Sequence, residues 1–573
     1  MFKGYGNYDK YPEKRIDGFE AVQGYEEIRE ILRKEAGKKE RHVITLELYT
    51  EVDVTELLGG LENLDANFFN AEGCMVEDVE YNRLIKPYLT EDRVFGIMNT
   101  LNIKDFYIPE KVEAMQKAIA AAKGLIVVYG VGASLVCEGD TLVYADLARW
   151  EIQCRFAKGA QNWKSNNQDA PKLAKFKQGF FLEWRMADRL KRRLFDKIDY
   201  LLDTNEAGVP KMVSGEGFRA GLRKFASEPF RLVPYFAPEV WGGQWMKEVC
   251  GLDKNSPNYA WAFDGVPEEN SILMKFGEVR IEVPSIDVVF YCAKQLLGHR
   301  VHARFGDEYP IRFDFLDTVG GQNLSLQVHP LTEYIQNAFH MHYTQDESYY
   351  ILDCGDDCEV YLGLKEGIDQ EGMLEELKQA QNGEITFDAA KYVNTFPVKK
   401  HDHFLIPAGT IHCSGKDTMV LEISATPYIF TFKLWDWGRL GLDGLPRPVH
   451  INHGEQVIQW DRTTEWVKEN LVNAITTISE DEHNKIEKTG LHEREFIETR
   501  RYTITTESIL ESEGSVSTCN VVDGEGAIIE SLDGSFEPYE VHYAETFIVP
   551  ESVKQFLIKP LGEEVKILRA TVR

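Results

Sequence analysis

The sequence predicts a multidomain chain in which an N-terminal α/β domain precedes two β-sandwich modules, the first of which carries a helical insertion. Three observations predict this organisation. The 573 residues are enough for about two to four domains of common size. The first part alternates helix-like and strand-like segments, whereas most segments after about Asp287 are short, strand-like and bounded by Gly, Asp-Gly or Pro. We therefore expect domains at 1–228, 229–452 and 453–573.

The predicted elements of the α/β domain follow from local patterns of apolar residues. Short apolar or β-branched runs predict strands, and a recurrence of apolar residues on one face predicts a helix. In "VEAMQKAIAAAKG", Met115, Ala118, Ile119 and Ala122 share one face, and Gly124 can end the helix. The expected strands begin at His42, Leu125 and Thr141, and a long amphipathic helix with a basic outer face is expected over 176–202.

Glycines after the second of these strands raise the question of a nucleotide site. The strand pattern resembles that of a P-loop kinase, but Gly130 and Gly132 are followed by Ala133, Ser134 and Leu135. A working phosphate loop needs a lysine that reaches the phosphates, and a dinucleotide fingerprint needs a third glycine. Both are missing from this stretch, so the pattern is degenerate and a simple tight turn is the favoured interpretation. The role of this domain is not indicated by the sequence.

Composition and charge exclude several classes of function. The net charge of −29 argues against nucleic acid or an anionic membrane as a main partner. No apolar stretch reaches the ~18–20 residues of a membrane span, and no signal peptide is visible. Nine scattered cysteines without a C-x-x-C pair indicate reduced thiols in a cytoplasmic protein. Cys354 and Cys358 could be metal ligands, although buried thiols are the simpler interpretation.

Elements of the second part include two helical patches among the strands. Pro229 begins a stretch rich in Pro, Gly and aromatic residues that suits a domain entry. A helix over 369–383 has an apolar stripe and ends at Gly383, and a second helical patch over 464–478 separates the two β modules. The two modules could be distant copies of one architecture.

Potential metal ligands are concentrated in two segments. "NLSLQVHPLTEYIQNAFHMHYTQDESYY" contains Gln327, His329, His340, His342 and Glu347, and "HDHFLIPAGTIHCSG" contains His412 after a Pro-x-Gly turn. Residues i and i+2 of a strand share a face, so Gln327 with His329 and His340 with His342 are two alternative pairs. This two-part pattern is typical of cupin barrels, and it predicts one divalent metal. A simple cupin would use His340, His342, Glu347 and His412.

Five ordered motifs resemble those of the type I phosphomannose isomerases: "LSLQVHP", "ESYYIL", "PAGTIH", "DWGR" and "RPVH", preceded by "WGG" at Trp241. The resemblance covers roughly residues 229–573 and implies two jelly-roll cupin modules, the second non-catalytic. It also implies Gln327, His329, Glu347 and His412 as ligands, with zinc the usual metal. The implied activity is metal-dependent interconversion of mannose 6-phosphate and fructose 6-phosphate through an enediol, with a sugar phosphate as the small-molecule partner.

The charged residues around this predicted metal depart from the family pattern. Asp314 and Gln345 stand where the family carries lysines, while Ile429 and Lys433 stand where it carries an aspartate and a catalytic arginine. Ser325 matches a phosphate-side serine. We therefore expect catalytic roles for the two cations Lys433 and Arg439, and substrate-side roles for Ser325, Arg312, His340 and His342.

Two alternative functions remain open from the sequence. A cupin with an intact metal site and altered surroundings could act on another sugar or sense a sugar phosphate. A metal-dependent oxygenase could use His340, His342, Glu347 and His412 as ligands. Zinc in the site favours the isomerase, and iron favours the oxygenase.

Overall fold

The computed structural model describes residues 4–425, 428–490 and 492–573. The described chain forms two compact units. The α/β unit contains residues 13–225 and 271–291, and the β unit contains residues 4–12, 226–270 and 292–573. The main division after Phe225 lies close to the expected one after Glu228. However, residues 271–291 return to the α/β unit and residues 4–12 join the β unit, so neither is one continuous stretch.

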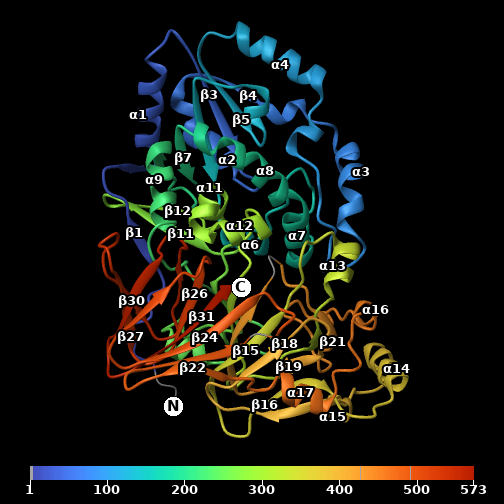
Figure 1. Ribbon diagram of the computed structural model, residues 1–573. Coiled ribbons are helices and arrows are strands. Elements are labelled where there is room, and N and C mark those ends of the chain that lie inside the picture. The colour runs from blue at the N-terminus through green and yellow to red at the C-terminus, as the bar shows by residue number, and fades with distance from the viewer. Residues whose placement is uncertain (1–3, 426–427, 491) are drawn as a thin grey trace. The chain divides into compact units, whose positions relative to one another are not determined.

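A seven-stranded sheet forms the centre of the α/β unit, in the order β2-β8-β7-β6-β3-β5-β4 (Figure 1). Its strands are β2 (Ala21–Gln23), β3 (Arg41–Leu48), β4 (Ala66–Asn70), β5 (Gly124–Gly130), β6 (Thr141–Asp146), β7 (Tyr200–Asp203) and β8 (Lys211–Ser214). β3 to β7 pair in parallel, and β8 runs antiparallel to both of its neighbours. The expected α/β sheet is thus present, while the P-loop-kinase-like character of the domain stays a prediction.

The central strand β3 shows why this sequence makes a buried parallel strand. Its run "HVITLEL" is buried at every position, which is typical of a strand covered on both faces. Val43 and its neighbours on β5 pack with α4 (Pro109–Ala121) and α5 (Ala133–Val136) into one apolar core. The carboxyl end of β3 carries Glu47, and its carboxylate lies in this buried setting.

Helices of the α/β unit follow the expected pattern with shifted ends. They are α1 (Tyr25–Ala36), α2 (Val54–Leu61), α3 (Asp78–Leu89), α4 (Pro109–Ala121), α5 (Ala133–Val136), α6 (Arg149–Ala157), α7 (Lys172–Gln178), α8 (Trp184–Leu194) and α9 (Gly215–Phe225). α4 is the helix predicted around Met115, and Pro109 occupies its first turn. Gly124 opens β5 with φ 72° rather than ending the helix.

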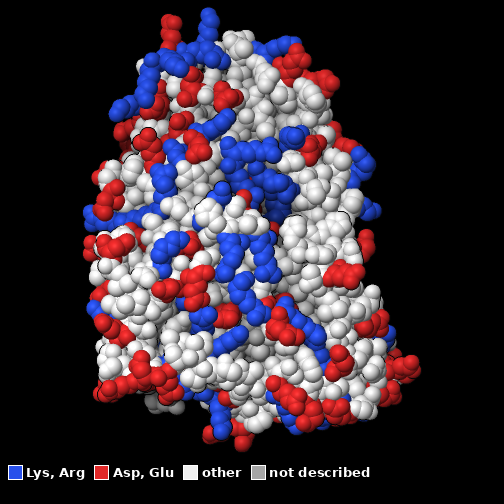
Figure 2. Space-filling model, viewed as in Figure 1, with Lys and Arg blue, Asp and Glu red and all other residues white. Residues whose placement is uncertain are grey.

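The long helix predicted over 176–202 is interrupted and shorter. α7, a π-helical turn over Gly179–Glu183 and α8 follow one another, and the run ends at Leu194. The last predicted residues instead form β7, because "YLL" is a short apolar run that pairs with β6. The basic outer face is present: Arg192 and Arg193 are exposed, and Figure 2 shows Lys and Arg side chains gathered over α8.

A small three-stranded sheet completes the α/β unit. It contains β1 (Glu13–Arg15), β11 (Ser271–Phe276) and β12 (Val279–Pro284). β1 pairs in parallel with β11, and β11 forms an antiparallel hairpin with β12. This hairpin is the segment that returns to the unit from far along the chain.

Two antiparallel sheets build the first module of the β unit. The six-stranded sheet has the order β18-β15-β20-β13-β10-β9, and the five-stranded sheet has the order β17-β16-β19-β14-β21. The strands are β9 (Tyr235–Ala237), β10 (Trp261–Gly265), β13 (Arg312–Asp317), β14 (Leu326–Val328), β15 (Glu347–Cys354), β16 (Glu359–Leu364), β17 (Val393–Pro397), β18 (His403–Ile406), β19 (His412–Ser414), β20 (Thr418–Ser424) and β21 (Phe432–Trp435).

The second β module also has two antiparallel sheets, ordered β22-β23-β24-β31-β26-β29 and β25-β30-β27-β28 (Figure 1). Its strands are β22 (Thr476–Glu480), β23 (Asn484–Gly490), β24 (Ile497–Ile504), β25 (Ser508–Glu511), β26 (Ser517–Asp523), β27 (Gly526–Ser531), β28 (Tyr539–His542), β29 (Thr546–Val549), β30 (Gln555–Pro560) and β31 (Val565–Val572). Apolar residues of both sheets share one core, as in a β-sandwich.

Helices interrupt the β-rich part more than the sequence predicts. They are α10 (Trp245–Val249), α11 (Ile286–Leu297), α12 (His299–Phe305), α13 (Thr332–Phe339), α14 (Gln370–Gln381), α15 (Ala389–Tyr392), α16 (Ile451–Gly454) and α17 (Thr464–Asn470). α14 is the predicted insertion, capped by Asp369 Oδ1 accepting from Gly372 N.

In the described chain, strands outnumber helices after about Asp287, as expected, although residues 286–305 first form α11 and α12 on a run with helical periodicity. One expectation about these elements is wrong. The helical patch over 464–478 ends at Asn470, and its last residues form β22.

Among the described residues, none of the helices combines the length and the apolar character that crossing a membrane requires.

Candidate metal centre

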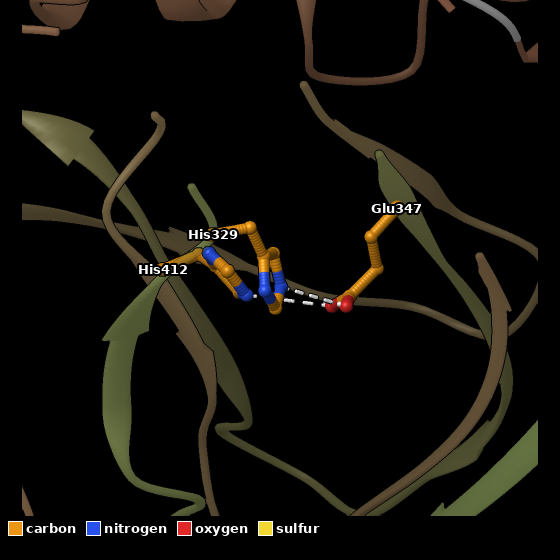
Figure 3. Close-up of side chains that lie close together, drawn as sticks. All are labelled: His329, Glu347 and His412. Atoms are coloured by element: carbon orange, nitrogen blue, oxygen red, sulfur yellow. Dashed lines mark ion pairs between the residues drawn. The ribbon is translucent and has the colours of Figure 1, made fainter. Parts of the chain in front are cut away.

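Four side chains from two facing sheets meet inside the first β module. Gln327 lies in β14 and His329 directly follows it, His412 begins β19, and Glu347 begins β15 in the opposite sheet. All four are buried, with exposed fractions of 5%, 0%, 0% and 1% respectively. Figure 3 shows the two imidazole rings pointing at the Glu347 carboxylate.

The distances between these groups are those of a compact ligand cluster. His329 Nε2 lies 2.8 Å from Glu347 Oε2, and His412 Nε2 lies 3.3 Å from Glu347 Oε1. Within the part of the chain that the structure describes, these three residues are the group of His, Cys, Asp and Glu whose ligand atoms all lie within 4.8 Å of one another. They are a group that could hold a metal ion.

Backbone carbonyls fix the tautomer of both rings. His329 Nδ1 lies 2.8 Å from Phe430 O, and His412 Nδ1 lies 2.9 Å from Thr410 O. A carbonyl oxygen only accepts, so each Nδ1 carries a hydrogen. In the neutral ring Nε2 then presents a lone pair to the carboxylate, which is the arrangement of a metal-bound histidine. Two lone pairs facing carboxylate oxygens at these distances repel unless a proton or a cation lies between them.

Burial and charge act in opposite directions on these three groups. Burial lowers the pKa of His329, but the Glu347 carboxylate more than offsets it and the pKa is raised. Burial dominates at His412, so its pKa is lowered. Burial raises the pKa of Glu347, but the charge and hydrogen bonding of His329 and His412 hold it well below its usual range. Glu347 is therefore a carboxylate that needs positive charge beside it.

Gln327 supplies a fourth donor at the same point. It is the cross-strand partner of His412, and its Nε2 lies 3.2 Å from His412 Nε2. The amide oxygen accepts from Ser325 Oγ at 3.1 Å. A half turn of the amide would direct its oxygen to the cluster, and the two orientations differ only in the placement of O and N. Two imidazoles, a carboxylate and an amide oxygen suit a borderline divalent cation.

A buried carboxyl group stands beside the cluster on the six-stranded sheet. Glu422 pairs across the strands with both Asp314 and Tyr349, and Tyr349 packs edge-on against His412. Burial, followed by the nearby Glu347 carboxylate, raises the pKa of Glu422 well above its usual value. Sequence reasoning missed Glu422, because its cross-strand partners Asp314 and Tyr349 come from other strands and cannot be identified from local sequence.

Arg312 and Asp314 form a buried ion pair. Arg312 Nη2 lies 2.9 Å from Asp314 Oδ2, and both side chains are at most 3% exposed. Arg312 Nη1 is buried without a hydrogen-bond partner. The predicted substrate-side role of Arg312 remains a prediction, but the guanidinium is already held by the residue that replaces the family lysine.

Lys433 lies on β21 beside Gln327, and Arg439 follows the strand. Lys433 is the cross-strand partner of Gln327, so the two side chains share the inner face of the five-stranded sheet. Burial, followed by the charge of Arg447, lowers the pKa of Lys433 to about 8. Arg439 donates to Asn323 O at 2.7 Å and pairs with Asp436. Their catalytic roles stay predictions.

The two further histidines lie outside the cluster. His340 ends α13 with φ 57°, and its side chain is exposed. His342 is exposed in the following loop, and its carbonyl accepts from Gln336 Nε2. Neither lies on a strand, so the i, i+2 argument for this pair does not apply. Their substrate-side role stays a prediction.

Gln345, which the sequence showed only as a missing lysine, contacts the cluster directly. Its Nε2 donates to Glu347 Oε2 at 2.9 Å, and its Oε1 accepts from Phe430 N at 2.8 Å. The signal was available, because Gln345 stands two residues before Glu347 on an extended segment and so shares its face.

Two further candidate sites from the sequence are the cysteine pair Cys354 and Cys358 and the glycine-containing loop after β5. Burial raises the pKa of Cys354 to about 11 and that of Cys358 as well, which favours neutral thiols.

In the loop after β5, Gly132 N and Ser134 N donate to Glu47 at 2.5 and 2.7 Å. Val131 N donates to Glu72 Oε1 at 3.0 Å. Carboxylates of the chain itself therefore occupy the N–H groups that a phosphate would need.

Comparisons with known proteins divide the chain in two. Residues 24–227 match a family described as a domain of unknown function, DUF8485. The mannose-6-phosphate isomerase ManA of Bacillus subtilis is 23% identical over 344 residues, which cover 59% of this chain and 98% of that protein. The mannose-6-phosphate isomerase of Streptococcus mutans is 24% identical over 336 residues, covering 58% of this chain and 95% of that protein.

Among solved structures, the mannose 6-phosphate isomerase of Bacillus subtilis matches 60% of this chain and 99% of that chain, at 19% identity and a TM-score of 0.48. A phosphomannose isomerase of Salmonella typhimurium matches 60% of this chain and 100% of that chain, at 14% identity and a TM-score of 0.45. The similarity to mannose-6-phosphate isomerases predicted from the motifs is thus confirmed over about three fifths of the chain.

Proposed function

We propose that the β unit is a metal-dependent isomerase that interconverts mannose 6-phosphate and fructose 6-phosphate. The observation that carries the proposal is the buried cluster of His329, Glu347 and His412, with both Nε2 atoms turned toward one carboxylate. The similarity to curated mannose-6-phosphate isomerases over nearly their whole length supports it. The fold of two facing sheets supplies the enclosed setting in which the cluster lies.

We assign the metal to Gln327, His329, Glu347 and His412, with zinc the metal that this donor set suits. A divalent cation bound there would stabilise negative charge that develops on the oxygens of the sugar. Thr410 O and Phe430 O hold the two rings in the tautomer that presents Nε2. Ser325 and Gln345 hold the amide of Gln327 and the carboxylate of Glu347.

The reaction moves a proton between C1 and C2 of the sugar through an enediol, so it needs a group that carries the proton and a positive charge near the oxygens. Lys433 is our candidate for the charge, because it shares the face of Gln327. Among the described residues it has neither a hydrogen bond nor an ion pair at its ammonium group, so it is available for a ligand. Arg439 is bound to Asp436 and would act by holding this region in place.

A coupled assay of the full chain tests the proposal. The zinc-loaded protein should convert mannose 6-phosphate to fructose 6-phosphate, and a chelator should abolish the activity reversibly. Glu347→Gln should lose both metal and activity, whereas His342→Ala, in an exposed loop, should keep the metal. An absence of conversion by metal-loaded protein, with sugar phosphate in excess, would contradict the proposal.

A further inference from the structure

Gln345 is the side chain that links two of the candidate ligands. It is 2% exposed and lies just before β15. Its amide nitrogen donates to Glu347 Oε2 at 2.9 Å, and its amide oxygen accepts from the backbone N–H of Phe430 at 2.8 Å. Both ends of the amide are therefore used, and neither bond is made to solvent.

These bonds belong to a closed circuit. The carbonyl of Phe430 accepts from His329 Nδ1 at 2.8 Å, and His329 Nε2 lies 2.8 Å from Glu347 Oε2. From Glu347 the circuit runs through Gln345 and the backbone of Phe430 to His329, and back to Glu347. The backbone of Phe430 thus orients the ring of His329 through its carbonyl and, through its N–H and Gln345, the carboxylate of Glu347.

The orientation of the Gln345 amide follows from its partners. A backbone N–H can only donate, so the group facing Phe430 N must be the amide oxygen. The NH₂ group then faces Glu347, whose carboxylate can only accept. A flipped amide would place donor against donor and acceptor against acceptor, so this is the single orientation with two good bonds.

A neutral amide has a different consequence from an ammonium group at this position. A lysine would neutralise Glu347 and compete with a cation for it, because its positive charge would lie against the carboxylate. The amide of Gln345 holds one carboxylate oxygen by a hydrogen bond and leaves the full negative charge available. Groups that orient metal ligands in this way commonly change metal affinity when they are removed.

We propose that Gln345 is a positioning residue that orients the side chains of Glu347 and His329 to bind one divalent cation. This inference rests on the proposed metal site, and it goes beyond it by assigning the organisation of that site to a residue outside the ligand set. It predicts that Gln345 affects affinity and coordination geometry without being a ligand.

Binding of Co²⁺ by the full chain tests the inference, because the visible absorption of Co²⁺ reports its coordination. Gln345→Met keeps the length of the side chain and removes both hydrogen bonds. We expect affinity about 10–100-fold weaker than in the parent, together with a changed absorption spectrum. Gln336→Met is the matched control, since Gln336 is exposed and its side-chain amide donates to His342 O; it should behave as the parent.

A second variant keeps the test decisive if Gln345→Met folds poorly. Gln345→Asn retains the amide on a chain one methylene shorter, so it can reach one partner but not both, and the loss of affinity should be intermediate. Parent-like affinity and spectrum in both Gln345 variants would overturn the inference while leaving the metal site intact. A parent protein that binds no Co²⁺ would overturn the proposed function, and this inference with it.

Discussion

Replacement of Lys191 by methionine should destabilise the α/β unit strongly. Lys191 lies in α8, and its ammonium group is 2.5 Å from Asp146 Oδ2 and 2.7 Å from Asp287 Oδ2. All three side chains are at most 1% exposed. Burial lowers the pKa of Lys191, but the two carboxylates more than offset it and the pKa is raised. Methionine keeps the apolar stem and removes the charge.

The size of the effect follows from what remains after the substitution. Two buried carboxylates would face each other without a counter-charge, and removing one partner from a buried ion pair commonly costs ~3–5 kcal/mol. Burial, only partly offset by Lys191, already raises the pKa of Asp287 to about 8. The variant should therefore take up a proton there, so the loss should be larger at alkaline than at neutral pH.

Hydrogen exchange measured by mass spectrometry suits this test, because the full chain contains two units and need not unfold in one step. Peptides of β6 and α8 should exchange about 10²–10⁴-fold faster in Lys191→Met, which corresponds to the expected free energy. Lys197→Met is the matched control: Lys197 is 58% exposed in its pair with Glu138, and little change is expected.

A double variant separates charge from packing. Asp287→Asn in the Lys191→Met background removes one of the two unpaired carboxylates, so part of the lost protection should return. Lys191→Met with protection within about threefold of the parent would refute the electrostatic reasoning. A double variant no better protected than the single one would refute it too.

Burial, then the charge of Arg501, lowers the pKa of His403 to about 3. The unfolded ring binds a proton below ~6.5 and the folded ring does not, so stability is lost as pH falls from 6.5 toward 3. Measured by hydrogen-exchange protection of β18, His403→Phe should lose ~2 kcal/mol less than the parent between pH 7 and 5. Lys433→Ala should lower turnover ~10²–10³-fold in the coupled assay and leave metal content unchanged; equal losses of both would contradict its role. Calorimetric titration should find no tight binding of MgATP, since Glu47 holds Gly132 N; micromolar binding lost in Gly132→Val would contradict this.

Local sequence patterns predicted the elements whose formation depends on neighbouring residues. The apolar run of β3 and the apolar stripe of α14 appear as expected, because a short apolar run and helical periodicity are local properties of the sequence. The helix predicted over 176–202 ended at Leu194, since pairing of β7 with β6 outweighed helical propensity. The return of residues 271–291 to the α/β unit depends on pairing of β11 with β1, across more than two hundred residues of chain.

The candidate site likewise contains residues that local motifs identify and residues whose contacts come from distant parts of the chain. Motifs identified His329, Glu347 and His412, and the structure brings these three together. The position of Gln345 two residues before Glu347 indicates that the two side chains share a face. Its second bond, to the backbone of Phe430, could not be predicted from local sequence, because Phe430 lies far along the chain. The pairing of Arg312 with Asp314 shows why a list of cations does not predict a phosphate site: a buried charge is first neutralised by its nearest neighbour.

Metal content of purified variants tests the central claim most directly. The parent and His340→Ala should each carry one zinc ion per chain, because His340 is exposed and lies outside the cluster. His412→Ala and Glu347→Gln should lose most of it, because each removes a ligand from a buried set of four. Full metal content in both of these variants, with loss of metal in His340→Ala, would contradict the assignment.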